Sequence, residues 1–100
     1  MQITKTNQTD AAMTFAVTGR IDTMTAPELE AALNEVPASV KEVVLGFKGL
    51  DYISSAGLRV LLSAHKKMRT QGGSLVITDT NEVINEIFEV TGFSDILNIR

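Results

Sequence analysis

The chain has 100 residues, enough for one small domain and too few for a second. Hydrophobic residues make up 44% and charged residues 21%, as in ordinary globular proteins, so the composition argues against disorder. The lack of cysteine excludes a disulfide scaffold and thiolate metal sites, and a net charge of −3 argues against broad nucleic-acid binding. No apolar run approaches the roughly 18 residues of a membrane span, and the first residues do not form a signal peptide. We therefore expect one soluble, cytoplasmic domain, 1–100, with no nucleic-acid partner and no membrane insertion.

Five short segments have the patterns of strands. Residues 13–18 alternate apolar and polar side chains, as in a strand with one covered face, and residues 1–6 carry a weaker form of this pattern. The continuous apolar runs at 43–45 and 75–77 fit strands buried on both faces, as in a parallel sheet. Residues 96–99 are predicted to add a last short strand.

Three stretches with the spacing of amphipathic helices separate these strands. Their expected ends are marked by capping residues, proline or glycine: Thr25 (with Glu28) and Pro37 for the first, Ser54 and Gly72 for the second, and Asp79 or Thr80 and Gly92 for the third. A turn at 48–51 precedes the second helix, and Val83 is predicted to face inward from the third. The order strand–strand–helix–strand–helix–strand–helix–strand predicts an α/β domain with a small mixed sheet, parallel apart from its N-terminal hairpin, and helices packed on it.

The chain lacks the residue clusters on which most enzymes depend. No glycine-rich loop with a lysine matches a phosphate-binding motif, and one histidine with scattered carboxylates offers no metal site. That histidine, His65, lies on the apolar face of the second helix, where we expect a structural role. We therefore expect no cofactor, no metal and no catalytic activity.

The start of the second helix combines two hydroxyls with a cation. Taken alone, Ser54 and Ser55 are expected to be capping residues, which contribute about 1 kcal/mol. Arg59 lies in the first turn, where a cation opposes the helix dipole, and it follows Ser55 by four residues on the same helix face. A serine at a helix N-terminus with an arginine at this spacing suits a phosphate, while an arginine that is merely solvated is the other interpretation.

Residues 50–62, LDYISSAGLRVLL, resemble the signature of STAS domains, specifically that of bacterial anti-sigma factor antagonists. The segment 19–22, followed by 25–27, is similar to the strand-to-helix connection of the family. Residues 88–93 resemble its third helix and the glycine that ends it. The resemblance covers essentially the whole chain, and the predicted order of elements is that of the family.

This resemblance implies a non-enzymatic role in partner switching. In the family, the unphosphorylated domain binds an anti-sigma factor that is also a serine kinase, and so releases the sigma factor. The kinase phosphorylates a serine at the start of the second helix, which ends the complex, and a PP2C-type phosphatase removes the phosphate. When the chain is aligned on Gly57 and Leu58, the modified position is Ser55, and Ser54 stands where the family usually has aspartate.

The resemblance also implies a set of partner-binding residues: Asp22, Thr23, Ser54, Ser55, Gly57 and Arg59. Structural duties stay open for several of them, since Gly57 also suits close packing of a helix on a strand and Thr23 also suits a turn. The alternative prediction is a STAS subunit of a membrane transport system, which would use the same fold to bind a transporter ATPase or permease.

Overall fold

The computed structural model describes all residues, 1–100. Five strands, three α-helices and a short 3₁₀ helix follow one another in the predicted order. The strands are β1 (Gln2–Gln8), β2 (Ala12–Ile21), β3 (Glu42–Ile53), β4 (Ser74–Thr78) and β5 (Asn98–Ile99). The helices are α1 (Ala26–Asn34), α2 (Ser55–Thr70) and α3 (Glu82–Thr91), and the 3₁₀ helix is η1 (Phe93–Asp95).

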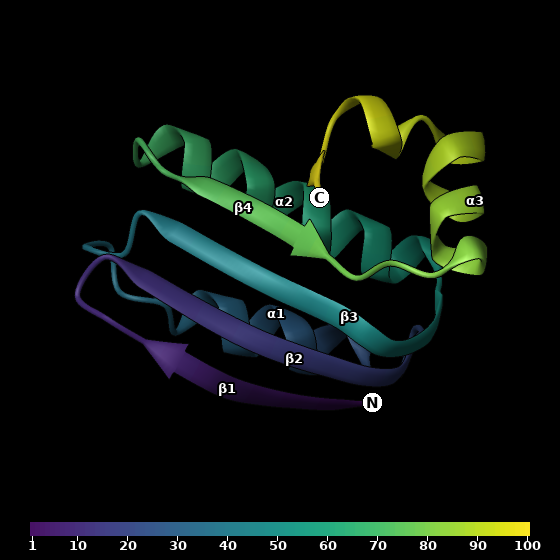
Figure 1. The fold of residues 1–100 in the computed structure, drawn as a ribbon, viewed down its shortest axis with the longest axis horizontal. Coiled ribbons are helices and arrows are strands. Elements are labelled where there is room, and N and C mark those ends of the chain that lie inside the picture. The colour runs from purple at the N-terminus through teal and green to yellow at the C-terminus, as the bar shows by residue number, and fades with distance from the viewer.

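The five strands form one mixed sheet in the spatial order β1-β2-β3-β4-β5 (Figure 1). β1 runs antiparallel to β2, and every other neighbouring pair is parallel. The alternation in β2 places Phe15 and Val17 on the buried face, and Leu45 of β3 pairs in register with both Phe15 and Ile77. The predicted mixed sheet with its N-terminal hairpin is confirmed.

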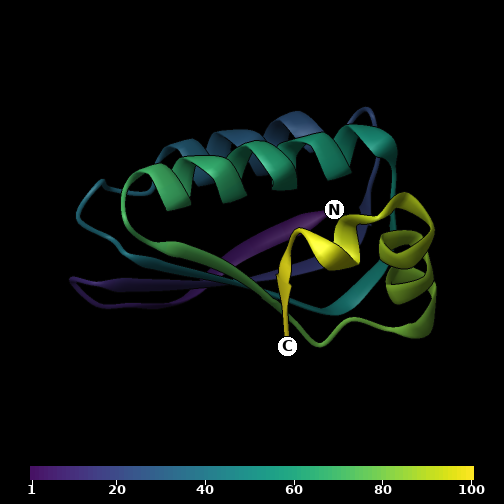
Figure 2. The ribbon, with the colours of Figure 1, turned by 90° about the horizontal axis from the view of Figure 1, so that it is seen from above.

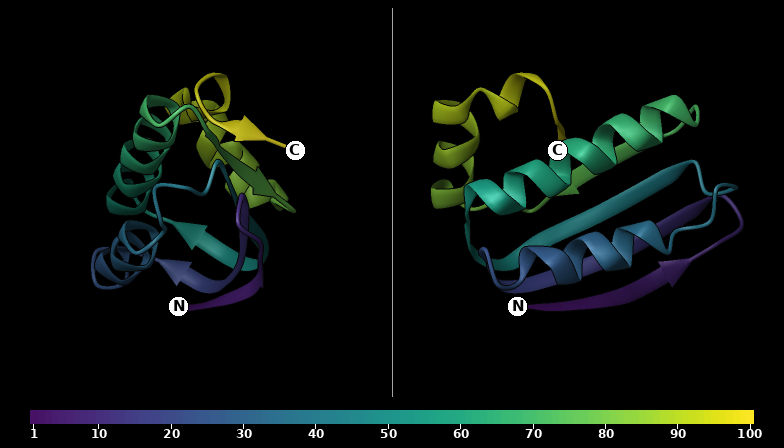
Figure 3. Two further views of the ribbon diagram at one scale, coloured as in Figure 1. Left: turned by 90° about the vertical axis from the view of Figure 1, so that its left-hand side faces the viewer. Right: turned by 180° about the vertical axis from the view of Figure 1, so that it is seen from behind.

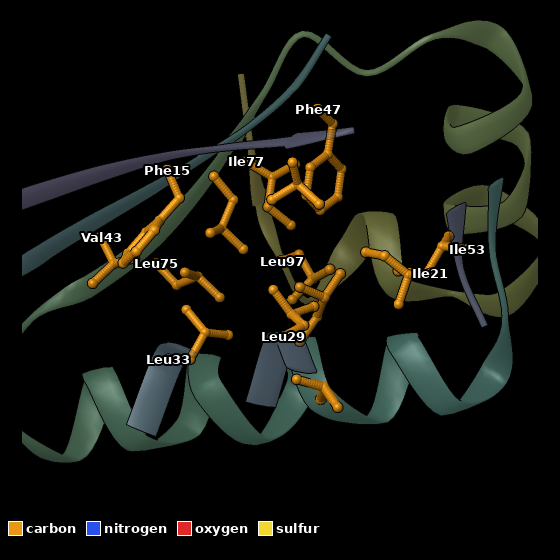
Figure 4. Close-up of a cluster of buried hydrophobic side chains, with 14 of the residues drawn as sticks. Phe15, Ile21, Leu29, Leu33, Val43, Phe47, Ile53, Leu75, Ile77 and Leu97 are labelled. Atoms are coloured by element: carbon orange, nitrogen blue, oxygen red, sulfur yellow. The ribbon is translucent and has the colours of Figure 1, made fainter. Parts of the chain in front are cut away.

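α1 and α2 lie side by side across one face of the sheet (Figure 2; Figure 3, right panel). α3 and η1 lie at the end of the molecule to which β3 and β4 run (Figure 1). The core fills the space between the sheet and the helices, and no polar or charged residue is buried in it (Figure 4). From α1 it includes Leu29 and Leu33, and from α2 Leu58 and Leu61, each of which stabilises the fold by about 1.5–3 kcal/mol when fully buried. None of the helices has the length and apolar character that a membrane crossing needs.

β3 is longer than the sequence pattern predicts, and its extra length positions α2. The predicted run at 43–45 is only part of a strand that spans Glu42–Ile53, so the prediction of a turn at 48–51 is wrong. Two register shifts opposite β2, in which β3 carries the extra residue, keep these turn-like positions in the sheet. The strand therefore continues to Ile53, whose partner in β2 is Ile21.

The helix ends agree with the prediction at a glycine and differ at a cap. Gly92 ends α3 in the left-handed conformation, with φ of 81°, as predicted. The N-cap of α3 is Asn81, whose side-chain oxygen accepts a hydrogen bond from the amide of Ile84 at 2.8 Å, and not Thr80 or the residue before it. The prediction that Val83 faces inward is also wrong, since Val83 is 51% exposed.

Candidate functional site

The loop after β2 is built around the carboxylate of Asp22. Its Oδ1 accepts hydrogen bonds from the backbone amides of Met24 and Thr25, both at 3.0 Å. The hydroxyl of Thr25 accepts a bond from the Asp22 amide at 2.8 Å and donates one to the carbonyl of Arg20 at 3.0 Å. Thr25 therefore closes this loop, and its side chain makes no cap bond to α1, so the predicted capping box with Glu28 does not form.

The same contacts favour the charged form of Asp22. The backbone amide of Thr25 is the main cause that lowers the pKa of Asp22 below its ordinary value of 3.8. Burial raises this pKa, whereas the Thr25 hydroxyl, the Met24 amide and Arg20 lower it further. Arg20 Nε lies 3.3 Å from Asp22 Oδ2, and the guanidinium carbon lies 5.1 Å from the ring centroid of Tyr52. The loop thus presents a carboxylate that is fixed beside an arginine and a tyrosine.

The two serines at the start of α2 differ in their access to solvent. The backbone amide of Ser54 donates to the carbonyl of Ile21 at 2.8 Å, which ties the start of α2 to the end of β2. The Oγ atom of Ser54 is buried and has no hydrogen-bond partner, so the predicted capping bond from this side chain is absent. Ser55, the first residue of the helix, is exposed. Of the two serines, only Ser55 is exposed to solvent.

Gly57 lets α2 lie directly on the sheet. A Cβ atom at this position would lie 2.6 Å from Cγ2 of Ile21 and 2.7 Å from Cγ1 of Ile53, two residues that stand together at the end of the core (Figure 4). No side chain fits at such distances without a shift of its neighbours. Gly57 is buried, so close packing of helix on strand, one of the two roles expected from the sequence, is the one that its surroundings show.

Arg59 and Thr23 meet at a groove between α1 and α2, which both residues line. Both are exposed, and Arg59 stands one helical turn after Ser55. Arg59 forms no ion pair, since the one salt bridge of the chain joins Arg20 at the end of β2 to Asp22. The structure therefore brings Thr23, Ser55 and Arg59 to one exposed surface beside that loop.

Other parts of the molecule offer little chemistry. No three histidine, aspartate or glutamate side chains are grouped so that they could hold a metal ion. His65 is half-buried on α2, and its Nδ1 atom is buried without a hydrogen-bond partner.

Sequence reasoning missed three residues of this surface: Arg20, Met24 and Tyr52. Met24 is 83% exposed in the Asp22 loop, and a large apolar residue within a polar loop is the signal that could have identified it. Tyr52 is 40% exposed beneath Arg20. The contact between Arg20 and Tyr52 depends on the second register shift between β2 and β3, after which these two residues pair. No local sequence pattern predicts that shift.

A family model of the STAS domain matches residues 3–100. BtrV of Bordetella bronchiseptica, named as an anti-sigma factor antagonist, is 37% identical over 91 residues, which are 90% of this chain and 78% of that protein. The anti-sigma-B factor antagonist of Bacillus subtilis is 32% identical over 95 residues, 95% of this chain and 85% of that protein. Among solved structures, the anti-sigma factor antagonist SpoIIAA in its unphosphorylated form shares the fold at a TM-score of 0.81 and 14% identity, with coverage of 99% of this chain and 88% of that one. The match runs from the first strand to the last, and the chain belongs to the STAS domain family.

Proposed function

We propose that this STAS domain is an anti-sigma factor antagonist, a regulatory protein of the cytoplasm and not an enzyme. In its unphosphorylated form it binds an anti-sigma factor and thereby frees a sigma factor. The names of its relatives in Bordetella and Bacillus support this function. The observation that carries it is the arrangement at the start of α2, where Ser55 is exposed beside the Asp22 loop while the Ser54 hydroxyl is buried.

Ser55 is the phosphoacceptor in this proposal. A kinase must reach the hydroxyl oxygen that it modifies, and of the adjacent pair only Ser55 is exposed. A phosphate on Ser55 sits at the N-terminus of α2, where the helix dipole favours an anion. Arg59, one turn later and free of ion pairs, is placed to donate a charge-assisted hydrogen bond to it.

The partner surface combines exposed residues with buried ones that support them. Four of the predicted residues reach solvent and contact the partner directly: Asp22, Thr23, Ser55 and Arg59. Ser54 and Gly57 act from beneath, because the Ser54 amide joins α2 to Ile21 and Gly57 sets the distance of the helix from the sheet. Displacing either one moves Ser55 relative to the Asp22 loop.

Phosphorylation ends the complex by adding about −1.5 to −2 charges inside the interface. The anti-sigma factor itself is the serine kinase, and a PP2C-type phosphatase returns the domain to its binding form. Both of these roles rest on the family resemblance.

The phosphoacceptor is tested by incubating the protein with ATP and each anti-sigma kinase of its source organism, followed by mass spectrometry. We expect one phosphate on Ser55 in the wild type and in Ser54→Ala, and none in Ser55→Ala. Ser54→Ala is the matched control, because it removes the neighbouring hydroxyl only. Phosphate that persists in Ser55→Ala contradicts the assignment.

The binding role is tested by titrating the purified anti-sigma factors with the wild type, Asp22→Ala and Ser55→Asp. Both variants should weaken the complex by at least about tenfold, because each changes a charge at the interface, while circular dichroism stays unchanged. Equal affinities for all three proteins would remove the site from the interface. Binding to a transporter ATPase or permease, and to no anti-sigma factor, would establish the alternative function.

A further inference from the structure

One exposed face of α2 carries a line of side chains that begins at the proposed phosphoacceptor. Residues separated by four, seven, eleven and fourteen positions lie along one side of a helix. In α2 they form what we name the basic stripe: Ser55, Arg59, Leu62, Lys66 and Arg69. All five are exposed except Leu62, which is half-buried.

The positive charge of this stripe is not balanced within the molecule. No acidic residue occurs between Asp51 and Asp79, so α2 holds none, although the whole chain has a net charge of −3. None of the stripe's three cations takes part in an ion pair. Arg69 lies in the last helical turn, where the helix dipole favours a cation. Lys66 lies before that turn, and Arg59 stands one turn after the first residue of α2, near the end of the helix whose dipole disfavours a cation, so the helix dipole accounts for neither.

A groove adjoins the stripe, and a segment of a partner protein can lie in it. It runs between α1 and α2, and Arg59 and Lys66 line it from α2. Ala26 and Pro27 line it from α1, and Glu30 is the one acidic residue in its wall. An acidic segment lying in this groove would meet two unpaired cations and one anion, so the charges complement each other.

We propose that the basic stripe and the adjoining groove bind an acidic segment of the anti-sigma factor; this inference rests on the function proposed above. Because Ser55 lies at one end of the stripe, its phosphorylation would weaken binding and not strengthen it. The phosphate brings negative charge to the positive end of the docking surface, where it pairs with Arg59 and repels the acidic segment. The complex is thus lost while α2 stays in place.

The stripe is tested with two charge reversals that change the net charge equally. Lys66→Glu alters the stripe, and Lys48→Glu alters an exposed lysine of β3 that does not line the groove. Affinity for the purified anti-sigma factor is measured by calorimetry at about 50 mM and about 300 mM salt. We expect Lys66→Glu to weaken binding at least about tenfold at low salt and less at high salt, while Lys48→Glu stays within about twofold of the wild type.

The outcomes separate this inference from the proposed function. If both variants bind equally well while Ser55→Asp still abolishes binding, the stripe is not the docking surface and the proposed function stands. If the wild type binds no anti-sigma factor of its organism, both proposals fall. If anionic phospholipid vesicles bind the wild type and not Lys66→Glu, with no change in affinity for the anti-sigma factor, the stripe serves a lipid surface and the proposal is overturned.

Discussion

Replacing Gly57 with alanine tests whether close packing of α2 positions the site. The new Cβ would lie 2.6 Å from Cγ2 of Ile21 and 2.7 Å from Cγ1 of Ile53, whereas carbon atoms pack at about 3.5–4.0 Å. Either the helix must move by about 1 Å or both isoleucines must leave their rotamers, and overpacking of this kind costs about 1–3 kcal/mol. The helix propensity of alanine returns up to about 1 kcal/mol. We expect a net loss of about 1–2 kcal/mol, which lowers the Tm of a domain of this size by about 5–15 °C.

The assay is thermal unfolding followed by circular dichroism, with Gly46→Ala as the matched control. A Cβ at Gly46 would meet its nearest atoms, the carbonyl oxygen of Phe15 and Oγ1 of Thr78, at 3.5 and 3.7 Å, which are ordinary contact distances. Its Tm should stay within about 3 °C of the wild type, as expected for a substitution without a clash. If the Tm of Gly57→Ala equals that of the wild type, or if the Tm of Gly46→Ala falls by as much as that of Gly57→Ala, close packing is not the reason for glycine at position 57.

Three further predictions concern the same end of the molecule. Phosphorylation of Ser55 should leave the Tm unchanged or slightly higher, because an anion at a helix N-terminus gains up to about 2 kcal/mol; a Tm several degrees lower would mean that the switch unfolds the domain. The pKa of Asp22 is lowered in the fold, so its stabilisation is complete above its ordinary value of 3.8 and is lost as the pH falls through the lower folded value. Urea unfolding should therefore show Asp22→Asn less stable than the wild type at neutral pH, with the difference disappearing in acid. Asn81→Ala should cost about 1–2 kcal/mol, because it removes the cap on Ile84 and the bond that Asn81 Nδ2 donates to the Leu50 carbonyl; Asn81→Asp, which keeps the cap acceptor, should cost less.

The order of strands and helices along the chain could be predicted because the buried strands have recognisable local sequence patterns. The residues at which each strand begins and ends could not be predicted in this way. The run at 43–45 is apolar on both faces, as a central parallel strand requires. The residues at 48–51 have the composition of a turn, and only their pairing with β2 across two register shifts keeps them in β3. Strand length is set here by a neighbour that lies far away in the sequence.

Helix caps were predicted poorly for a related reason. Several residues before α3 have side chains that can cap a helix, and the sequence does not rank them. Asn81 is selected because its amide also reaches the Leu50 carbonyl at 2.9 Å, a contact between segments 31 residues apart. At α1, the capping-box pattern of Thr25 failed because its hydroxyl is engaged by the backbone of the Asp22 loop. A tertiary hydrogen bond decides the cap of α3, and at α1 competing bonds within the preceding loop take the hydroxyl that a cap would use.

The candidate site shows the same division between local and tertiary information. The spacing of Ser55 and Arg59 along one helix is visible in the sequence. Which of two adjacent serines is open to solvent is not, because that depends on how the start of α2 is turned by its bond to the Ile21 carbonyl. Burial of the Ser54 hydroxyl turns an ambiguous pair into a single candidate.

The construction of this site argues that the proposed phosphorylation switch would act at the interface and not through the fold. Ser55 stands on a junction held by the Ser54–Ile21 hydrogen bond and by the contact of Gly57 with the two isoleucines beneath it. Unfolding that junction would require a perturbation comparable to the whole stability of a small domain, about 5 kcal/mol or more. A new charge that must be desolvated against a partner costs several kcal/mol, and about 3 kcal/mol already lowers affinity more than a hundredfold. The smaller of these two energies would be enough to end the complex. We therefore expect a phosphate on the exposed Ser55 to lower affinity for the partner and to leave the fold intact.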